Sequence, residues 1–249
     1  MEQIKTDKDT EITIKTKGKE KTFSLYSKEG FDYLSLLWLK LGAQNRLMYE
    51  VNWMGVPFIQ LAEDLVMMQE LVWTLKPDVI VECGVGQGGG ILFYSSILEL
   101  IGKGKVIGVD IDIRLPNRKR IENSSFKNRI ELIEGSSISP NVVKQLRRKL
   151  ENTESVLIIL DSDHTYKHVL AELNLYHSFV TKDSYLVVMD GGAAHVWDIP
   201  RDQSKYKDDH PILAIEEFLK NNNNFEIDHH YNRLGITSSP LGFLKKTNG

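Results

Sequence analysis

Short apolar runs alternate with helical patterns along the chain from Pro77 onward. Each apolar run predicts a buried strand, whereas the segments between the runs carry apolar residues at helical spacing. Strands are expected at 79–83, 106–110, 130–133, 156–160 and 185–190, with final strands at 225–227 and 234–237. Helices are expected at 90–101, 116–123, 139–151, 165–180 and 211–220. This alternation predicts an α/β fold in which a mostly parallel sheet carries helices on both faces.

The first part of the chain lacks this repeating pattern. We expect an N-terminal arm and helix at 1–50, followed by one domain at 51–249. Residues 1–25 alternate weakly between apolar and polar positions, which fits a peripheral hairpin or a mobile arm. Residues 28–50 carry leucines at helical spacing and predict one helix.

A second helical pattern, between 61 and 75, directly precedes the first expected strand. Pro77 is expected to end this helix, because proline cannot continue one. The side chains of Met67, Met68 and Trp73 are expected to pack in the core rather than to contact a cofactor.

Composition narrows the class of protein. The chain has 249 residues, a net charge of −3 and a pI near 6.2, so we expect no nucleic-acid partner and no charge-driven membrane binding. No apolar run reaches the ~18 residues of a membrane span, and no signal-peptide pattern is present. The single cysteine, Cys83, fits a reducing compartment, and we therefore expect a cytoplasmic protein.

Polar residues gather where the expected strands end. Ligands bind beyond the carboxyl ends of the strands in sheets of this kind, so these residues are the functional candidates. Four of the five groups carry an acid, although like charges would converge on one rim. The groups are 82–90, Asp110 with Asp112, 135–137, 161–164 and 190–195.

The first group contains the glycine-rich stretch VIVECGVGQGGG, which starts at Val79. Gly84, Gly86 and Gly89 satisfy the pattern G-x-G-x-x-G between a strand and a helix, and Asp110 ends the next strand, where a ribose-binding acid belongs. Such glycines let a ligand approach the backbone closely. The pattern alone fits a nucleotide site or a structural tight turn.

Glu82, two residues before the first glycine, favours one class of ligand. Its carboxylate would repel a pyrophosphate and attract the ammonium or sulfonium of S-adenosylmethionine, unless it forms a salt bridge instead. An NAD-dependent oxidoreductase therefore remains a weaker alternative, and no Tyr-x-x-x-Lys pattern follows a later strand.

Several stretches resemble class I S-adenosylmethionine-dependent methyltransferases, and more specifically the cephalosporin hydroxylase family, which includes rhamnosyl O-methyltransferases. They are WMGVPFIQLAEDLVMMQELVWTLKPDVIVECGVGQGGG, VIGVDIDIRLPNR, RIELIEGSSISP, LDSDHTYKHVLAELNLYHSFVTKDSYLVVMD and FEIDHHYNRLGITSSPLGFLKK. Together they extend from Asn52 to Lys246. The resemblance implies a Rossmann-like methyltransferase fold, often in homo-oligomers. It also implies methyl transfer to a hydroxyl of a sugar or small polar metabolite, with a glycan or small molecule as acceptor. A non-catalytic protein that binds S-adenosylmethionine is the other alternative.

The resemblance also implies cofactor contacts for individual residues. Those for the methionine portion and the adjoining loop are Glu82, Gly84, Gly86, Gln87 and Gly88; those for the ribose are Asp110, Ile111 and Asp112; those for the adenine are Gly135, Ser136 and Ser137. Asp161 completes this set from a neighbouring strand end.

Related O-methyltransferases bind a divalent cation at the ends of two adjacent strands, which implies Asp161 and Asp190 as ligands of Mg²⁺. His164 or Asp163 is then the candidate general base, and His195 a second base or a substrate contact. Other roles stay open: Asp161 as a helix cap, and His164 as a packed, hydrogen-bonded side chain.

One position departs from the family pattern. Members from antibiotic pathways carry an acid directly before the aspartate that corresponds to Asp190. This chain carries Met189 there, which is a poor ligand for Mg²⁺. Asp198 and Asp202 in the following loop are candidates to replace the missing acid.

The loop 191–210 is expected to act as a lid or specificity element, with Trp197 either stacking on a sugar ring or anchoring the loop. His168 and His177 are expected in a helix, far from the strand ends. The histidines therefore form no pattern for a two-histidine, one-carboxylate iron site.

Overall fold

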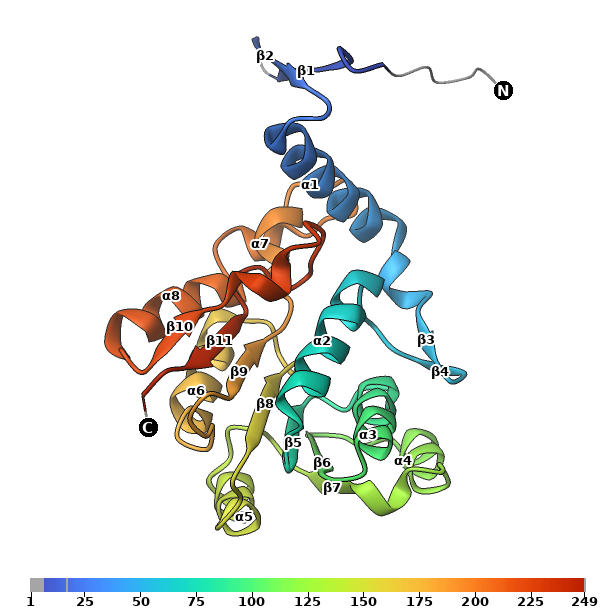
Figure 1. Ribbon diagram of the computed structural model, residues 1–249, viewed down its shortest axis with the longest axis vertical. Coiled ribbons are helices and arrows are strands. Elements are labelled where there is room, and N and C mark those ends of the chain that lie inside the picture. Colours follow the sequence, from blue (N-terminus) through green and yellow to red (C-terminus); the bar gives the residue numbers. More distant parts are fainter. Residues whose placement is uncertain (1–6, 17, 249) are drawn as a thin grey trace.

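A seven-stranded sheet forms the centre of the protein (Figure 1). The computed structural model describes residues 7–16 and 18–248. The strands of the sheet are β5 (Val79–Cys83), β6 (Lys105–Asp110), β7 (Ile130–Glu134), β8 (Val156–Leu160), β9 (Tyr185–Val188), β10 (Phe225–Ile227) and β11 (Phe243–Lys246). Their order is β10-β11-β9-β8-β5-β6-β7, and only the pairings of β11 with its two neighbours are antiparallel. The expected α/β fold with a mostly parallel sheet is confirmed.

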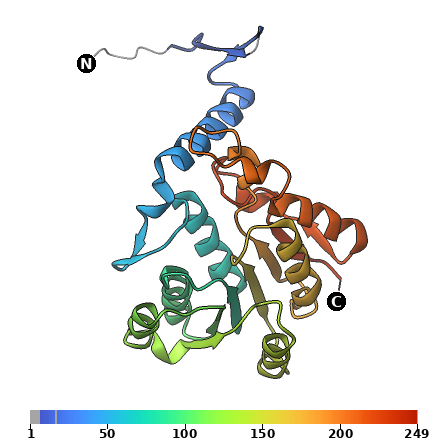
Figure 2. The ribbon, with the colours of Figure 1, turned by 180° about the vertical axis from the view of Figure 1, so that it is seen from behind.

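Helices cover both faces of the sheet (Figure 2). They are α2 (Ala62–Leu75), α3 (Gly89–Ile101), α4 (Leu115–Glu122), α5 (Pro140–Leu150), α6 (Tyr166–Tyr176), α7 (Ala193–Val196) and α8 (Pro211–Asn221). Apolar residues of α5, α6 and α8 pack on one face, and those of α2, α3 and α4 on the other. Across residues 7–16 and 18–248, no helix combines the length and the apolar character that a membrane crossing needs.

Short elements complete the chain. They are the strand pair β3 (Asn52–Trp53) and β4 (Val56–Pro57) and the 3₁₀ helices η1 (Leu47–Tyr49), η2 (Lys127–Arg129), η3 (Ser204–Lys207) and η4 (His229–Asn232). The η1 turn and the β3–β4 pair connect the N-terminal helix to α2, so they bring this helix to the edge of the sheet where the ligand is expected.

The N-terminal part forms a hairpin and a helix that stand away from the sheet (Figure 1). The hairpin pairs β1 (Glu11–Thr16) with β2 (Lys19–Ser24), and α1 (Lys28–Asn45) follows. The hydroxyl of Ser27 accepts a hydrogen bond from the amide of Gly30 at 3.0 Å and caps the start of α1. Of the two expectations for this segment the hairpin is therefore correct, although residues 1–6 and 17 lie outside the described part.

Two expectations about the core and the sheet are wrong. The segment 234–237 forms no strand, because Gly235 adopts a left-handed backbone (φ 83°) and Thr237 binds a side chain of α2 instead of a neighbouring strand. The last strand along the chain is β11, which lies between β10 and β9 in the sheet. Met67 and Met68 are buried as expected, but Trp73 lies on the outer side of α2 with 47% of its surface exposed.

Leu98 and Leu100 of α3 are a matched pair for testing how much the packing of α3 against the sheet stabilises the fold. Leu98 is fully buried, whereas Leu100 is 78% exposed two residues later on the same helix. Leu98→Ala should lower the free energy of unfolding by about 2–5 kcal/mol, because it leaves a cavity against the sheet. Leu100→Ala should change it by less than ~0.5 kcal/mol. Urea unfolding of both variants measures the difference, and equal losses would contradict this packing.

Candidate active site

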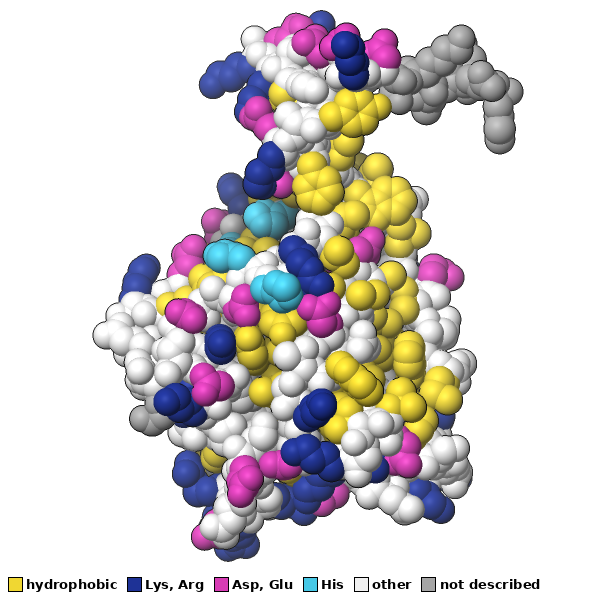
Figure 3. Space-filling view, in the orientation of Figure 1, with side chains coloured by type: hydrophobic (Ala, Val, Ile, Leu, Met, Phe, Trp, Pro, Cys, Tyr) yellow, Lys and Arg dark blue, Asp and Glu magenta, His cyan; other side chains and the backbone are white. Residues whose placement is uncertain are grey.

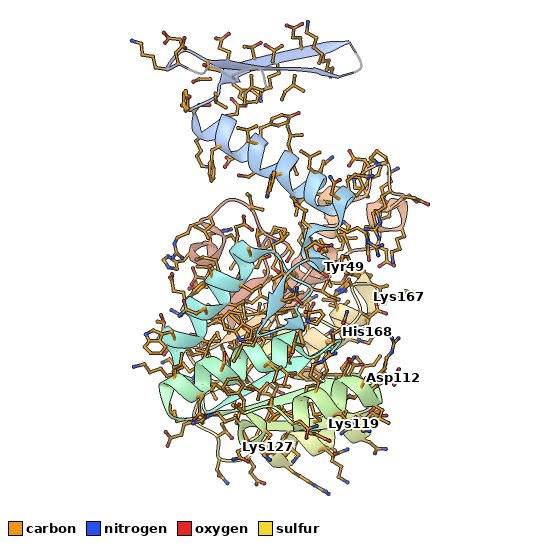
Figure 4. All side chains as sticks on the ribbon, turned by 90° about the vertical axis from the view of Figure 1, so that its right-hand side faces the viewer. Tyr49, Asp112, Lys119, Lys127, Lys167 and His168 are labelled. Carbon is orange, nitrogen blue, oxygen red and sulfur yellow. The ribbon has the colours of Figure 1, made fainter. Side chains whose placement is uncertain are left out.

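A cavity of about 710 Å³ lies beyond the carboxyl ends of the parallel strands. Residues of α1, η1 and the loop that leads to η3 close it from the other side, and Tyr49 and His168, which both line it, are labelled in Figure 4. Most residues selected from the sequence line this one cavity: Glu82, Gly84, Gly86, Gln87, Asp110, Ile111, Ser136, Ser137, Asp161, Asp163, His164 and Asp190.

The glycine loop fits tightly between two neighbouring strand ends. Gly84 has φ 103° and donates from its amide to the carbonyl of Val109 at 2.8 Å. A Cβ atom at Gly84 would overlap the backbone carbonyl of Asp161. Any other residue would therefore be strained here and would push the ends of β5 and β8 apart.

Asp110 is held in place by the glycine loop. Its Oδ2 accepts hydrogen bonds from the amides of Val85 and Gly86 at 2.8 and 3.0 Å, and its Oδ1 accepts one from the amide of Asp112 at 3.1 Å. The side chain of Asn117 donates to the carbonyl of Gly86 at 2.9 Å and braces the loop from α4, a contact that the sequence did not predict. The carboxylate faces the cavity in one orientation, as a group that binds a diol must.

Glu82 is a buried acid without a partner. Its side chain lines the cavity with 2% of its surface exposed, and a Cβ at Gly90 of α3 would overlap its carboxylate. Burial, followed by the charge of Asp110, raises the pKa of Glu82 well above its usual range. Its Oε2 has no hydrogen-bond partner among the described residues, so Glu82 forms no salt bridge there. A cationic ligand would satisfy this oxygen.

Asp161, His164 and Asp190 converge at the ends of β8 and β9. One ligand atom from each lies within 4.8 Å of the others, and the Nε2 of His164 is 3.0 Å from the Oδ2 of Asp190. Burial raises the pKa of Asp161 well above its usual range, and the charges of Asp190 and Glu82 raise it further. A cation placed among these groups would relieve the repulsion.

Asp163, rather than Asp161, binds the backbone just before α6. Its Oδ1 accepts a hydrogen bond from the amide of Thr165 at 2.8 Å, at the start of α6. Burial works to raise the pKa of Asp163, but the hydrogen bonds from Thr165 outweigh it and lower the pKa. Asp163 is therefore a weaker candidate for a general base than His164.

The residues proposed to replace the missing acid lie elsewhere. Met189 is buried in the core, and its sulfur is 3.5 Å from the hydroxyl of Ser239. Asp198 pairs with Lys40 at 2.6 Å, and Asp202 accepts hydrogen bonds within its own turn. Neither Asp198 nor Asp202 lines the cavity. The donors that could hold a divalent cation are therefore two carboxylates and one imidazole.

Four of the predicted residues lie outside the cavity lining. Gly88 directly precedes α3, Gly135 packs near α5, and the side chain of Asp112 is mostly exposed. His195 lies on α7, where burial and the neighbouring charge of His210 lower its pKa. These four residues lie next to the residues that line the cavity but do not border the cavity themselves.

His168 corrects a prediction, because it lines the cavity (Figure 4). Its Nε2 lies 3.1 Å from the hydroxyls of Ser137 and Ser162, and Ser162 donates to the buried Glu172 at 2.7 Å. The hydrogen bond with Glu172 raises the pKa of His168. The spacing of His168 and Glu172, four residues apart on one helix, was the available signal. Because only residues 161–165 separate α6 from the end of β8, the first turn of α6 belongs to the site.

The wall opposite the glycine loop combines α1 and η1, which the sequence did not indicate, with the loop 191–210, which it did. Leu39 and Ala43 of α1 and Met48 and Tyr49 of η1 form its apolar part, and Arg201, Gln203 and Tyr206 form its polar part. The loop 191–210 therefore does reach the cavity. Trp197 does not line it, and the ammonium of Lys207 lies 5.6 Å from the centre of the Trp197 ring. Of the two roles open for Trp197, its position favours anchoring the loop.

Asp64 is a further residue that the sequence did not reveal. It is 1% exposed on α2 and accepts hydrogen bonds from the hydroxyl of Thr237 at 2.6 Å and from the amide and hydroxyl of Ser238 at 2.7 Å each. The carbonyl of Ser238 in turn accepts from the amide of Gly192 at 2.7 Å. Asp64 thus holds the turn that carries Asp190, whose own backbone is left-handed (φ 57°).

Burial raises the pKa of Asp64 to about 6. Because the folded state then holds this proton more tightly than the unfolded chain, Asp64 favours folding at low pH and loses this contribution as the pH rises through 6. Asp64→Asn removes the titration. The free energy of unfolding of the variant, relative to the native chain, should therefore rise by roughly 1 kcal/mol between about pH 5 and about pH 7. Urea unfolding at both pH values measures this, and a constant difference would contradict the raised pKa.

Known proteins resemble this chain over most of its length. A rhamnosyl O-methyltransferase of Mycobacterium leprae is 32% identical over 200 residues, which cover 80% of this chain and 81% of that protein. A rhamnosyl O-methyltransferase of Mycobacterium bovis is 29% identical over 228 residues, which cover 85% and 80%.

Solved structures share the fold. An apo structure of CmcI superposes with a TM-score of 0.59 at 17% identity, covering 81% of this chain and 78% of the other. A structure of CmcI with Mg and S-adenosylmethionine gives 0.57 at 18% identity, covering 80% and 78%. The family model for rhamnosyl O-methyltransferase/CmcI matches residues 45–247. The chain therefore belongs to the rhamnosyl O-methyltransferase/CmcI family of S-adenosylmethionine-dependent methyltransferases, as its sequence motifs indicated.

Proposed function

We propose that this chain transfers the methyl group of S-adenosylmethionine to a hydroxyl of a sugar. The single observation that carries the proposal is Glu82, a buried carboxylate that faces the cavity beside the glycine loop and lacks a partner among the described residues. The two mycobacterial relatives are rhamnosyl O-methyltransferases, which supports a sugar as the acceptor class.

In this proposal the cofactor lies along the strand ends. Glu82 faces the cationic methionine end, and the fixed carboxylate of Asp110 accepts hydrogen bonds from the ribose hydroxyls. Ser137, held by His168, borders the adenine. A dinucleotide in the same place would put its pyrophosphate against Glu82, so this charge argues against NAD.

Asp161 and Asp190 would hold a divalent cation such as the Mg of the CmcI structure. When bound, such a cation lowers the pKa of a substrate hydroxyl and orients it. The donor set suits this role, because carboxylate oxygens are the ligands that Mg²⁺ prefers. Because Met189 is a thioether that lies in the core, position 189 adds no third carboxylate to this pair.

His164 accepts the hydroxyl proton in the proposed reaction. Asp190, 3.0 Å from its Nε2, stabilises the imidazolium that forms. The hydroxyl oxygen forms a bond to the methyl carbon while the bond from that carbon to sulfur breaks, and the electron pair stays on sulfur as S-adenosylhomocysteine. Holding oxygen, carbon and sulfur in line supplies much of the rate. The intact His164–Asp190 pair argues against a protein that only binds the cofactor.

The wall opposite the glycine loop would receive the acceptor. Tyr49 and Tyr206 offer ring faces against which a sugar can pack, and Arg201 and Gln203 offer donors for its hydroxyls. The acceptor is a glycan or a small glycoside in this reading.

Thermal unfolding with S-adenosylmethionine, S-adenosylhomocysteine or NAD, each with and without Mg²⁺, tests the cofactor. A ligand at a hundred times its dissociation constant adds about 2.7 kcal/mol, which is a shift of roughly 5–11 °C for a chain of this size. Both adenosyl ligands should give the shift and NAD should not.

Glu82→Gln is the matched variant in that experiment. It should fold at least as well, because the buried oxygen has no partner to lose, and it should bind S-adenosylmethionine about 10–100-fold more weakly. A shift with NAD alone, or equal cofactor affinity in the variant, would refute the proposal.

Asp190→Asn tests the catalytic pair. Asparagine tolerates the left-handed backbone of this position and keeps the size of the side chain. It should lower kcat by about 10²–10⁴-fold, because His164 loses its charged partner. The affinity for S-adenosylhomocysteine should stay within about threefold of the native value. The control, Asp198→Asn, alters a carboxylate outside the cavity and should keep full activity. Methyl transfer to sugar acceptors measures both, and an active Asp190→Asn would remove Asp190 from the mechanism.

A further inference from the structure

The outer side of α1 carries a bare apolar stripe. Phe31, Leu34, Trp38 and Leu41 follow one another at steps of three and four residues, so they lie on one side of the helix. Their exposed fractions are 50, 41, 49 and 55%, and Tyr26 just before the helix is 61% exposed. Figure 3 shows hydrophobic side chains gathered along the neck that α1 forms between the hairpin and the body. The helix α1 therefore exposes an apolar surface to water, which is unfavourable.

The helix is apolar on every side at its centre. No charged residue lies between Asp32 and Lys40. Leu39 and Ala43 are buried against the body, near Val196 of α7. A helix that is apolar all round is a buried helix in folded proteins. Only one side of α1 is covered by the described residues, so its sequence fits a second neighbour on the outer side.

The hairpin points to the same conclusion. It stands at the far end of α1, clear of the sheet and its helices (Figures 1 and 2). Its contact with α1 includes the rings of Phe23 and Tyr33, whose centres are 5.6 Å apart. An isolated two-stranded hairpin is marginally stable in water. We therefore expect a hairpin in this position to pack on a further surface.

The area of the stripe fits a subunit interface. A large aromatic side chain presents roughly 150–250 Å², so five half-exposed large side chains offer on the order of 400–500 Å². That equals the largest apolar patch of a typical monomer, about 300–600 Å². It is also about half to three-fifths of the ~800 Å² that each partner contributes to a stable interface. The hairpin can supply the remainder.

We propose that α1 packs against α1 of a second copy of this chain, antiparallel and around a two-fold axis near the middle of the stripe. The stripe is then its own complement, as a two-fold interface requires. Glu29 and Asp32, near the start of the stripe, pair with Lys21 and Lys28 of the same copy, so the antiparallel arrangement rests on the apolar stripe rather than on charge. The antiparallel arrangement also places each hairpin against the other copy, whereas a parallel pair leaves both hairpins clear of the other copy's body.

The pairing reaches the cavity through the same helix. Leu39 and Ala43 on the inner side of α1 line the cavity, and Met48 and Tyr49 follow in η1. Holding α1 from outside therefore fixes the wall opposite the glycine loop. That this wall receives the acceptor rests on the function proposed above; the pairing itself does not.

Trp38 and Trp73 provide a matched test. They are 49% and 47% exposed, on α1 and α2. In size-exclusion chromatography with light scattering, the native chain should be a dimer or a multiple of it. Trp38→Glu should be monomeric, and Trp73→Glu should keep the native mass. A native chain that is monomeric at its highest soluble concentration would overturn the proposal, and so would a dimeric Trp38→Glu.

A second measurement uses the native chain and so does not depend on how the variants fold. Hydroxyl-radical footprinting should modify Trp38 several-fold less than Trp73, because the second copy covers it, and equal modification would overturn the pairing. The S-adenosylhomocysteine shift in thermal unfolding separates the two proposals. A monomeric Trp38→Glu that keeps the shift supports the pairing with the cofactor site intact. A native dimer without any shift refutes the cofactor and leaves the pairing standing.

Discussion

Two carboxylates, the buried Glu82 and the half-buried Asp161, face the same cavity, and charging both without a cation beside them is unfavourable. Burial raises the pKa of each, and the neighbouring acids Asp110 and Asp190 raise these values further. Without a cation this arrangement lowers the stability of the folded state, because like charges converge in a place of low polarity. A sulfonium or ammonium, together with a divalent cation, would remove that cost. The stability of the fold and the chemistry of the site are therefore coupled through charge, and groups with strongly shifted pKa values mark functional sites for this reason.

The rest of the structure holds these acids in position. The glycines at 84 and 90 are the residues that let the carbonyl of Asp161 and the carboxylate of Glu82 lie so close to the loop and to α3. Asp64 fixes the turn after β9 from behind, through Ser238. Each acid is thus placed by a different layer of the fold, which keeps the site in one geometry before a ligand arrives.

The sequence predicted the parts that depend on local patterns. Short strands, the glycine loop and the acids at strand ends follow from periodicity and spacing, and the structure brings them to one edge of the sheet. The sequence did not predict the roles of His168 and Asp64, because these roles arise from contacts with residues far along the chain. The strand expected at 234–237 failed for the same reason: the hydroxyl of Thr237 binds Asp64 of α2, and this tertiary contact outweighs the local pattern.

The position of Met189 is consistent with the crowding of acids around it. Asp190 turns toward the cavity through a left-handed backbone, whereas Met189 completes the buried layer between the sheet and α2 and α3. The charge of Asp190 already contributes to the raised pKa of Asp64, which is buried on the same side. An acid at 189 would add a further carboxylate between them, in a place with no base to pair with it among the residues described around it. A thioether there keeps the core apolar and leaves Asp161 and Asp190 as the carboxylates of the cluster, with one fewer charge for a bound cation to neutralise.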